Sequence, residues 1–277
     1  MPDDNDLKRF YENYWFKRIM EEETKVFWPV YSEAYSWWKM KNIVLKLVKE
    51  ELKKSKKSHF EILDIGCGKG TDVFMLNALL KIFSLRFTAI DISPVSIEFA
   101  NMLREMRGDR NCFFKVGNAE KLEFDDDTFD VILCSEIIEH LPKPERCLAE
   151  IYRVLKMKGL AIITTPNPRN IAKRIIPKKS MQKIDEEQKW CFQRHGNLAP
   201  ETGHISEKSC KEWRNLSMKV GFKIEAIKRV SVLYGGPFFD RHPTLFGMLL
   251  MFDSFLDHLP YAYNLSCIIV MKLRKGE

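Results

Sequence analysis

The sequence predicts an α/β protein built on an open, mostly parallel, doubly wound sheet. The first observation is an apolar run that ends in Asp64 and is typical of a buried parallel strand. The second is the turn after it, where Gly66, Gly68 and Gly70 stand at alternate positions before a periodic, helical stretch over 71–80. The third is the alternation of apolar runs with helical patterns further along the chain, which favours parallel strands joined by helices.

The glycine turn predicts a nucleotide site. Glycine lets the backbone turn sharply and approach a ligand because no Cβ stands in the way. In doubly wound sheets the ligand lies outside the carboxyl end of the strand that feeds such a turn. A dinucleotide loop would need glycine where Thr71 stands, and a phosphate-binding loop would need Ser or Thr directly after Lys69. The turn therefore matches neither of these two loop types.

The second strand, 87–91, ends in Asp91, which lies 21 residues beyond Gly70. That distance is typical of the carboxylate that takes both ribose hydroxyls of an adenosine in this kind of sheet. Ile92 follows it and could lie against the adenine face. Ser93 and Pro94 then begin a helix, with Ser93 as the N-cap and Pro94 in the first turn.

The other elements follow from periodicity and from turn residues. A turn is expected over 155–159, and seven strands are expected in all. The remaining segments are a helix over 37–52, strands over 112–116 and 129–135, a helix over 144–155, a strand over 160–165, a helix from a Ser206 cap to Val220 that Gly221 ends, a strand over 222–232, a helix over 243–259 and a strand over 266–273.

Two regions flank or interrupt this pattern. Residues 1–57 are expected to form a helical, aromatic-rich N-terminal cap, which would act as a lid over the cleft or simply pack on the core. Residues 58–277 form the main domain. Within it, 168–205 is basic, polar and poorly periodic, and a connection of that length is usually functional or disordered. We interpret it as an insertion on the substrate side.

Composition narrows the class of protein. The chain has 277 residues, of which 45% are hydrophobic and 30% charged, as in ordinary globular proteins. Its net charge of +7 is a mild excess and not the signature of a nucleic-acid binder. Seven scattered cysteines and an acidic, polar start over 1–23 predict reduced thiols and a cytoplasmic location. The apolar stretch 245–252 is too short to span a bilayer.

From 60 to 165 the order of motifs resembles class I S-adenosylmethionine-dependent methyltransferases, closest in character to the quinone-biosynthesis type. The resemblance implies a Rossmann-like fold with an antiparallel last strand, S-adenosylmethionine as cofactor and S-adenosylhomocysteine as product. Asn118 stands where the family usually has the Asp that meets the adenine amino group, and it keeps a carbonyl acceptor. The cofactor-binding residues implied are Asp64, Gly66, Cys67, Gly68, Gly70, Asp91, Ile92, Asn118, Ala119 and Ser135.

The segment after the fourth strand carries the expected chemistry. A hydroxyl nucleophile usually needs a base, and His140 is the candidate, with Glu136 and Glu139 beside it. The alternative for His140 is a structural role, as a helix cap or as a partner of the backbone. We assign no resident metal. Small-RNA 2′-O-methyltransferases, however, resemble this segment in using Glu-x-x-Glu-His and a later histidine to hold a divalent ion, and here His204 or His195 would be that histidine.

Other metal and substrate classes receive less support. Cys191 with His195, and His204 with Cys210, have irregular spacing for zinc and include no Cys-x-x-Cys pair. The Asn-Pro-Pro-Tyr motif of base N-methylation is missing after the fourth strand.

Three functions remain open. The expected function is methylation of an oxygen, in preference to carbon or nitrogen, of a small or lipid-like molecule. The apolar segment 237–263 would wall its pocket, rest on a membrane surface or simply cover the sheet. The alternatives are metal-assisted methylation of RNA ribose and a non-catalytic protein that binds S-adenosylmethionine. No oligomeric state is predicted.

Overall fold

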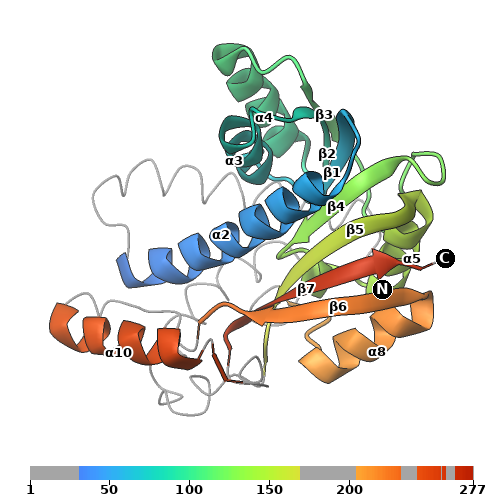
Figure 1. Cartoon of the computed structure of the whole chain (residues 1–277). Coiled ribbons are helices and arrows are strands. Elements are labelled where there is room, and N and C mark those ends of the chain that lie inside the picture. Colours follow the sequence, from blue (N-terminus) through green and yellow to red (C-terminus); the bar gives the residue numbers. More distant parts are fainter. Residues whose placement is uncertain (1–30, 169–203, 232–241, 257, 260–265, 277) are drawn as a thin grey trace, which may run out of the picture.

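The computed structural model describes residues 31–168, 204–231, 242–256, 258–259 and 266–276. They form one seven-stranded sheet in the order β3-β2-β1-β4-β5-β7-β6, with helices on both of its faces (Figure 1). The first 30 residues and most of the predicted insertion 168–205 lie outside the described residues. The predicted α/β fold is thus confirmed for the sheet, and of the N-terminal cap only the part from Tyr31 onward is described.

Five strands are parallel, and they carry the carboxyl ends at which a ligand is expected. They are β1 (His59–Ile65), β2 (Ser84–Asp91), β3 (Cys112–Val116), β4 (Phe129–Ser135) and β5 (Leu155–Pro166). The last two are β6 (Phe222–Arg229) and β7 (Ile268–Lys275), and β7 runs antiparallel to both β5 and β6, as the family resemblance predicted.

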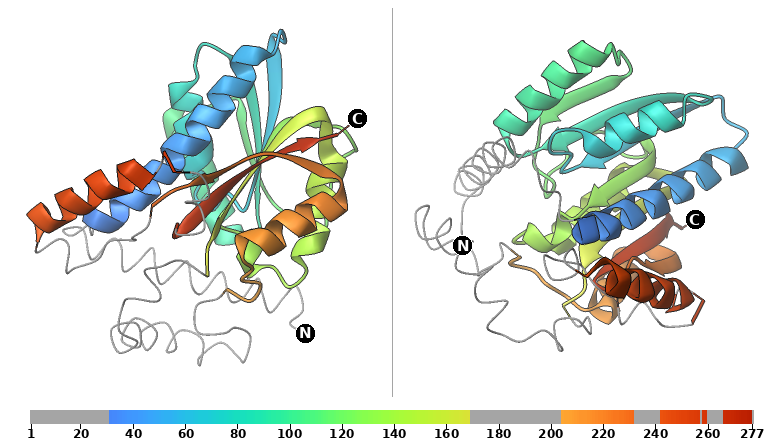
Figure 2. Two further views of the ribbon diagram at one scale, coloured as in Figure 1. Left: turned by 60° about the horizontal axis from the view of Figure 1, so that its bottom comes forward. Right: turned by 90° about the vertical axis from the view of Figure 1, so that its left-hand side faces the viewer.

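The helices bury one apolar core on each face of the sheet. Helices α2 (Tyr31–Lys54), α3 (Thr71–Leu79) and α4 (Pro94–Arg107) pack on one face. Helices α5 (Pro144–Val154) and α8 (Cys210–Val220) pack on the other, where Trp213 is fully buried. Helix α10 (Pro243–Leu256) projects beyond the sheet next to the start of α2 (Figures 1 and 2). Among the described residues, every helix is too short or too polar to cross a bilayer.

Helix α2 covers the helix predicted over 37–52 and packs one apolar stripe on the sheet. Met40, Val44 and Val48 have no exposed surface, whereas Trp37 is 49% exposed. Lys41, on the same helix, is buried and not solvated.

Helix α8 corrects the predicted start of that helix. Its N-cap is Ser209 and not Ser206. Ser209 forms a capping box with Glu212, which satisfies two otherwise unpaired backbone donors at the helix start. Ser206 instead donates its hydroxyl to the carbonyl of Leu141, at 2.6 Å. The Ser-x-x-Glu signature was present in the sequence and would have located the cap.

Strand β5 is longer than predicted because it absorbs the expected turn over 155–159. Leu155 pairs with Phe129, and Leu160 pairs with Val131, so the intervening residues form an irregularity in the ladder. Lys158 adopts a positive φ of 62° there. At the other elements, β6 ends at Arg229 and α10 at Leu256, both earlier than predicted.

Candidate functional site

The glycine turn joins the carboxyl end of β1 to α3, and it needs glycine for two different reasons. Gly66, Gly68 and Gly70 have φ values of 71°, 50° and 82°, in the left-handed region that L side chains avoid. A Cβ on Gly66 would lie 2.2 Å from Cγ1 of Ile137. A Cβ on Gly68 would meet no protein atom within 4 Å. Gly68 therefore faces open space at the place where the ligand was predicted.

Asp91 ends β2 and holds this turn. Its carboxylate accepts hydrogen bonds from the backbone N–H of Gly68, at 2.8 Å, and of Ser93, at 2.9 Å. Burial raises the pKa of Asp91, and the backbone donors oppose that rise. The carboxylate thus lies against the glycine turn, and each of its oxygens keeps a lone pair for a further donor.

The adenine-side residues lie on the loop after β3. Asn118 uses its side-chain oxygen to accept the N–H of Glu120 at 2.8 Å, which closes a small turn. Gly117 donates its N–H to the carbonyl of Asp91 at 3.0 Å, so this loop is tied to the end of β2. Ala119 is buried and Ile92 half-buried. The predicted ribose acid and the predicted adenine loop are therefore neighbours.

The end of β1 gathers buried carboxylates around one lysine. Burial and the nearby Asp72 raise the pKa of Asp64 well above its usual range, and Lys41 opposes this rise. The Lys41 amine lies 2.5 Å from a carboxylate oxygen of Asp72, and both side chains are almost fully buried. Sequence reasoning missed this pair. The signal that could have found it is a lysine adjacent to the buried stripe of α2, together with an acid in the first turn of α3.

Two further residues that were predicted to bind the cofactor lie at the carboxyl ends of the parallel strands. The hydroxyl of Ser135, at the end of β4, is buried and has no hydrogen-bond partner among the described residues. Cys67 is buried, and burial together with Asp64 raises the pKa of its thiol well above the usual value, so the thiol stays protonated at neutral pH.

Glu136 takes a strained conformation directly after β4. Its φ is 55°, which is uncommon for a residue other than glycine and is a feature that clusters at functional sites. Thr164, on β5, accepts the N–H of Glu136 and donates its hydroxyl to the Glu136 carboxylate at 2.9 Å. Burial raises the pKa of Glu136, and the hydroxyl of Thr164 opposes that rise.

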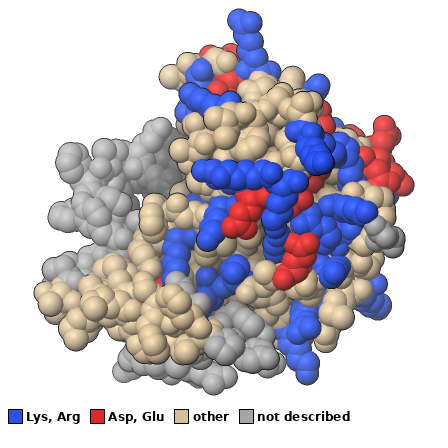
Figure 3. Space-filling model, in the orientation of Figure 1, with Lys and Arg blue, Asp and Glu red and all other residues tan. Residues whose placement is uncertain are grey.

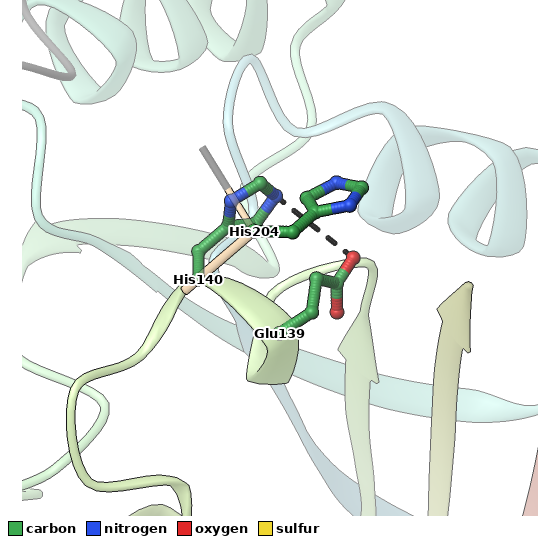
Figure 4. A group of neighbouring side chains, drawn as sticks. All are labelled: Glu139, His140 and His204. Carbon is green, nitrogen blue, oxygen red and sulfur yellow. Dashed lines mark ion pairs between the residues drawn. The ribbon is translucent and has the colours of Figure 1, made fainter. Parts of the chain in front are cut away.

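Glu139, His140 and His204 come together although 64 positions separate the two histidines (Figure 4). One ligand atom from each lies within 4.8 Å of the other two. Nε2 of His140 is 3.8 Å from the Glu139 carboxylate, and the two imidazole rings are 4.7 Å apart. The second Glu139 oxygen accepts the hydroxyl of Thr165 at 3.1 Å. Burial and the charge of Glu136 raise the pKa of Glu139 well above its usual value.

This cluster differs from the predicted metal set in one member. The Glu136 carboxylate is bonded to Thr164 and is not part of the three-residue group, whereas His204 is. His195, the other candidate ligand, lies outside the described residues, as does Cys191 of the zinc hypothesis. Cys210 is buried as the first residue of α8 and is not in the group.

The residues present fit an adenosine-containing cation. The open side of Gly68 leaves room for a ligand, and the Asp91 carboxylate beside it suits vicinal hydroxyls. Asp64, Asp72, Glu136 and Glu139 outnumber the one buried lysine among them, so a positively charged ligand would relieve their mutual repulsion. A sulfonium such as that of S-adenosylmethionine carries this charge.

Comparison with known proteins gives the same family. A family model described as a methyltransferase domain matches residues 56–219. An uncharacterized methyltransferase, YcgJ of Bacillus subtilis, is 26% identical over 158 residues, which cover 57% of this chain and 55% of that protein. A ubiquinone biosynthesis O-methyltransferase of Rickettsia bellii is 30% identical over 146 residues, which cover 48% of this chain and 58% of that one. The chain thus spans less than two thirds of the length of these relatives.

Solved structures share the fold. The crystal structure of YcgJ covers 84% of this chain and 98% of its own, with a TM-score of 0.53 at 18% identity. A geranyl diphosphate methyltransferase in complex with GPP and sinefungin covers 84% of this chain and 77% of its own, with a TM-score of 0.55 at 15% identity. The family model covers more than half of the chain. The chain therefore belongs to the methyltransferase-domain family, whose class I members use S-adenosylmethionine as the methyl donor.

Proposed function

We propose that the protein transfers a methyl group from S-adenosylmethionine to an oxygen of a small or lipid-like molecule. The observation that carries this proposal is the pairing of the open Gly68 turn with the Asp91 carboxylate, at the end of the strands where the family binds its cofactor. The similarity to ubiquinone biosynthesis O-methyltransferases supports an oxygen acceptor.

Each residue has a role that follows from its position. Asp91 would hold the ribose hydroxyls, and Asn118, Ala119 and Ile92 would border the adenine. Asp64, Asp72 and Lys41 would surround the amino-acid end. The bound cofactor supplies an activated methyl group, so the chain's own task is to align the acceptor with it and to exclude water.

His140 is the proposed general base for the acceptor hydroxyl. Its side chain is 20% exposed, so it borders solvent, and Glu139 beside it is almost completely buried. When His140 accepts a proton, the Glu139 carboxyl group, 3.8 Å from Nε2 of the ring, favours the protonated form. Glu139 is therefore proposed as a positioning residue for His140, and Glu136 as the residue whose strained backbone sets the course of this loop.

Replacing His140 by Gln should lower kcat by about 100-fold and leave the affinity for S-adenosylmethionine unchanged, because only proton transfer loses its acceptor. The measurement combines calorimetry with the cofactor and single-turnover transfer of a labelled methyl group. His59→Gln is a control, since His59 lies at the amino end of β1. Equal rates for the parent and His140→Gln would show that this histidine is not the base.

The acceptor is best found by incubating the protein and labelled cofactor with fractionated small molecules, lipids, RNA and protein from the source cell. Label in the small-molecule or lipid fraction supports the proposal, and label only in RNA or protein contradicts it. Tight cofactor binding without transfer to any fraction would favour a non-catalytic cofactor-binding protein. The cytoplasmic location remains part of the proposal, and the six described cysteines, all buried and free of disulfides, support it.

The second candidate is metal-assisted methylation of an RNA ribose, and the Glu139–His140–His204 group favours it. One carboxylate oxygen and two imidazole nitrogens within 4.8 Å of one another are ligand types that bind divalent transition-metal ions, for which Mn²⁺ serves as the probe. The Glu139 oxygen nearest His140 has no hydrogen-bond partner among the described residues, so it is available to an ion.

Under this second candidate, His204→Ala should weaken Mn²⁺ binding by about 100-fold, because one of three protein ligands is lost. Calorimetry with Mn²⁺ alone measures it, and His258→Ala, an exposed histidine after α10, is the matched control. A parent protein that binds no Mn²⁺, or that methylates its acceptor at an unchanged rate after chelation, would rule this candidate out.

A further inference from the structure

Helix α10 presents an unusually apolar outer surface. Six large hydrophobic side chains of 245–259 are exposed, with Met251 at 76%, Met248 at 64% and Phe255 at 59%. They recur at the three- and four-residue intervals that place side chains on one side of a helix. The set, which we call the α10 face, is Leu245, Met248, Met251, Phe252, Phe255 and Leu259.

The only charged residue of α10, Asp253, fixes this orientation. It is 5% exposed and accepts hydrogen bonds from Arg229 on β6, from Lys39 on α2 at 2.7 Å and from Tyr35 at 3.2 Å. Because these partners lie on the protein side, the helix cannot turn its apolar side inward without leaving a buried charge unpaired. The α10 face is thus held outward by a network of polar contacts.

The apolar surface continues onto the start of α2. Tyr35 contacts Phe246 edge-on, with ring centroids 6.3 Å apart, and stacks with Trp38 at 6.5 Å. Trp38 and Trp37 are 61% and 49% exposed. Tryptophan is the side chain most typical of the boundary between lipid and water. Figures 1 and 2 show α10 and the start of α2 extending together beyond the sheet.

The charges around this surface complement an anionic layer. The exposed described residues of α10 and its flanks include no acid. Lys46 and Lys49 are exposed further along α2, and the chain carries a net charge of +7. In Figure 3, Lys and Arg gather over the middle of the molecule beside the uncharged surface that α10 projects. Apolar and cationic groups side by side are the pattern of an interfacial membrane contact.

We propose that the α10 face and Trp37 and Trp38 dock this protein on the surface of a lipid bilayer that carries anionic headgroups. The 14 residues of α10 span about 21 Å at ~1.5 Å per residue, less than the roughly 30 Å hydrocarbon core. The helix therefore lies in the headgroup region and does not cross the hydrocarbon core. This inference is independent of methyl transfer, although a lipid-like acceptor would be met at such a surface.

Contacts between α2 and the sheet relate this surface to the candidate site. Ser36, beside Trp37, shares a hydrogen bond with Ser231 at 2.6 Å, and Ser231 accepts the N–H of Cys267. Cys267 in turn accepts the N–H of Asn167, directly after β5. The start of α2 thus lies at the carboxyl end of the parallel strands, the end that carries the cofactor residues. Docking there would bring that end toward the lipid.

The test is flotation of the full chain with vesicles of phosphatidylcholine, with and without phosphatidylglycerol. The parent protein should float with the anionic vesicles, and the bound fraction should fall at least tenfold for Met251→Glu/Phe255→Glu. Met106→Glu is the matched control, because Met106 is equally exposed, at 77%, on α4. It should float as the parent does.

Three outcomes would overturn the proposal. They are no flotation of the parent protein, equal flotation of the α10 variant and the Met106→Glu control, and a dimer in sedimentation velocity that only the α10 variant loses. The last would assign the surface to a second copy of this chain. Calorimetry with S-adenosylmethionine on the α10 variant shows that it is folded, and it separates failure of docking from failure of the proposed methyl transfer.

Discussion

Replacing Asp91 by Ala should weaken S-adenosylmethionine binding by about 100-fold or more, because two hydrogen bonds from the ribose to a buried carboxylate are lost. The variant should nevertheless fold. Burial raises the pKa of Asp91, which means that its charge costs the folded protein free energy at neutral pH. Calorimetry measures the affinity, and thermal unfolding without cofactor measures the stability.

Asp130 provides a matched control for this prediction. It is 7% exposed, as Asp91 is, but it lies at the amino end of β4 and bonds Lys57, Lys156 and the N–H of Glu61. Although burial opposes it, these donors lower the pKa of Asp130, so this carboxylate stabilises the fold. Asp130→Ala should therefore reduce stability and keep the cofactor affinity. If Asp91→Ala binds S-adenosylmethionine as tightly as the parent, the ribose assignment is wrong.

Replacing Gly66 by Ala should destabilise the protein by about 2–4 kcal/mol, whereas Gly68→Ala should cost only about 1–2 kcal/mol. Both alanines take an unfavourable positive φ, but only the Cβ at position 66 overlaps another side chain, that of Ile137. Gly68→Ala should instead lower the affinity for S-adenosylmethionine at least tenfold, because its methyl group points into the space left for the ligand. Urea unfolding and calorimetry measure the two effects.

A double variant separates the overlap from backbone strain. The two nearest Ile137 atoms, at 2.2 Å and 2.3 Å, are Cγ1 and Cδ1, and Ile137→Ala removes both. Gly66→Ala/Ile137→Ala should therefore be more stable than the sum of the single changes predicts. Strict additivity would show that the overlap is not what excludes a side chain at position 66.

Much of the fold could be predicted from local pattern. The strands ending at Asp91, Val116 and Ser135 lie where the apolar runs placed them, because a strand buried on one face alternates and a strand buried on both faces is continuously apolar. Ser93 caps the start of α4 and Gly221 caps the end of α8, as predicted, because a helix cap depends only on residues within a few positions of it. The prediction of a turn over 155–159 was wrong. Leu155 instead pairs with Phe129 of the neighbouring strand β4, and this pairing depends on residues outside the local segment.

The parallel strands, the glycine turn and the acid that closes it could be predicted from the sequence, because each is encoded by residues close together in the chain. Three contacts became visible in the folded chain: His204 joins Glu139 and His140, Lys41 enters the acidic cluster beside Asp72, and Asp253 holds the apolar side of α10 outward. These contacts join residues 24 to 218 positions apart. They depend on burial and on the pairing of charges between packed elements. A local sequence pattern does not specify which distant group becomes the partner.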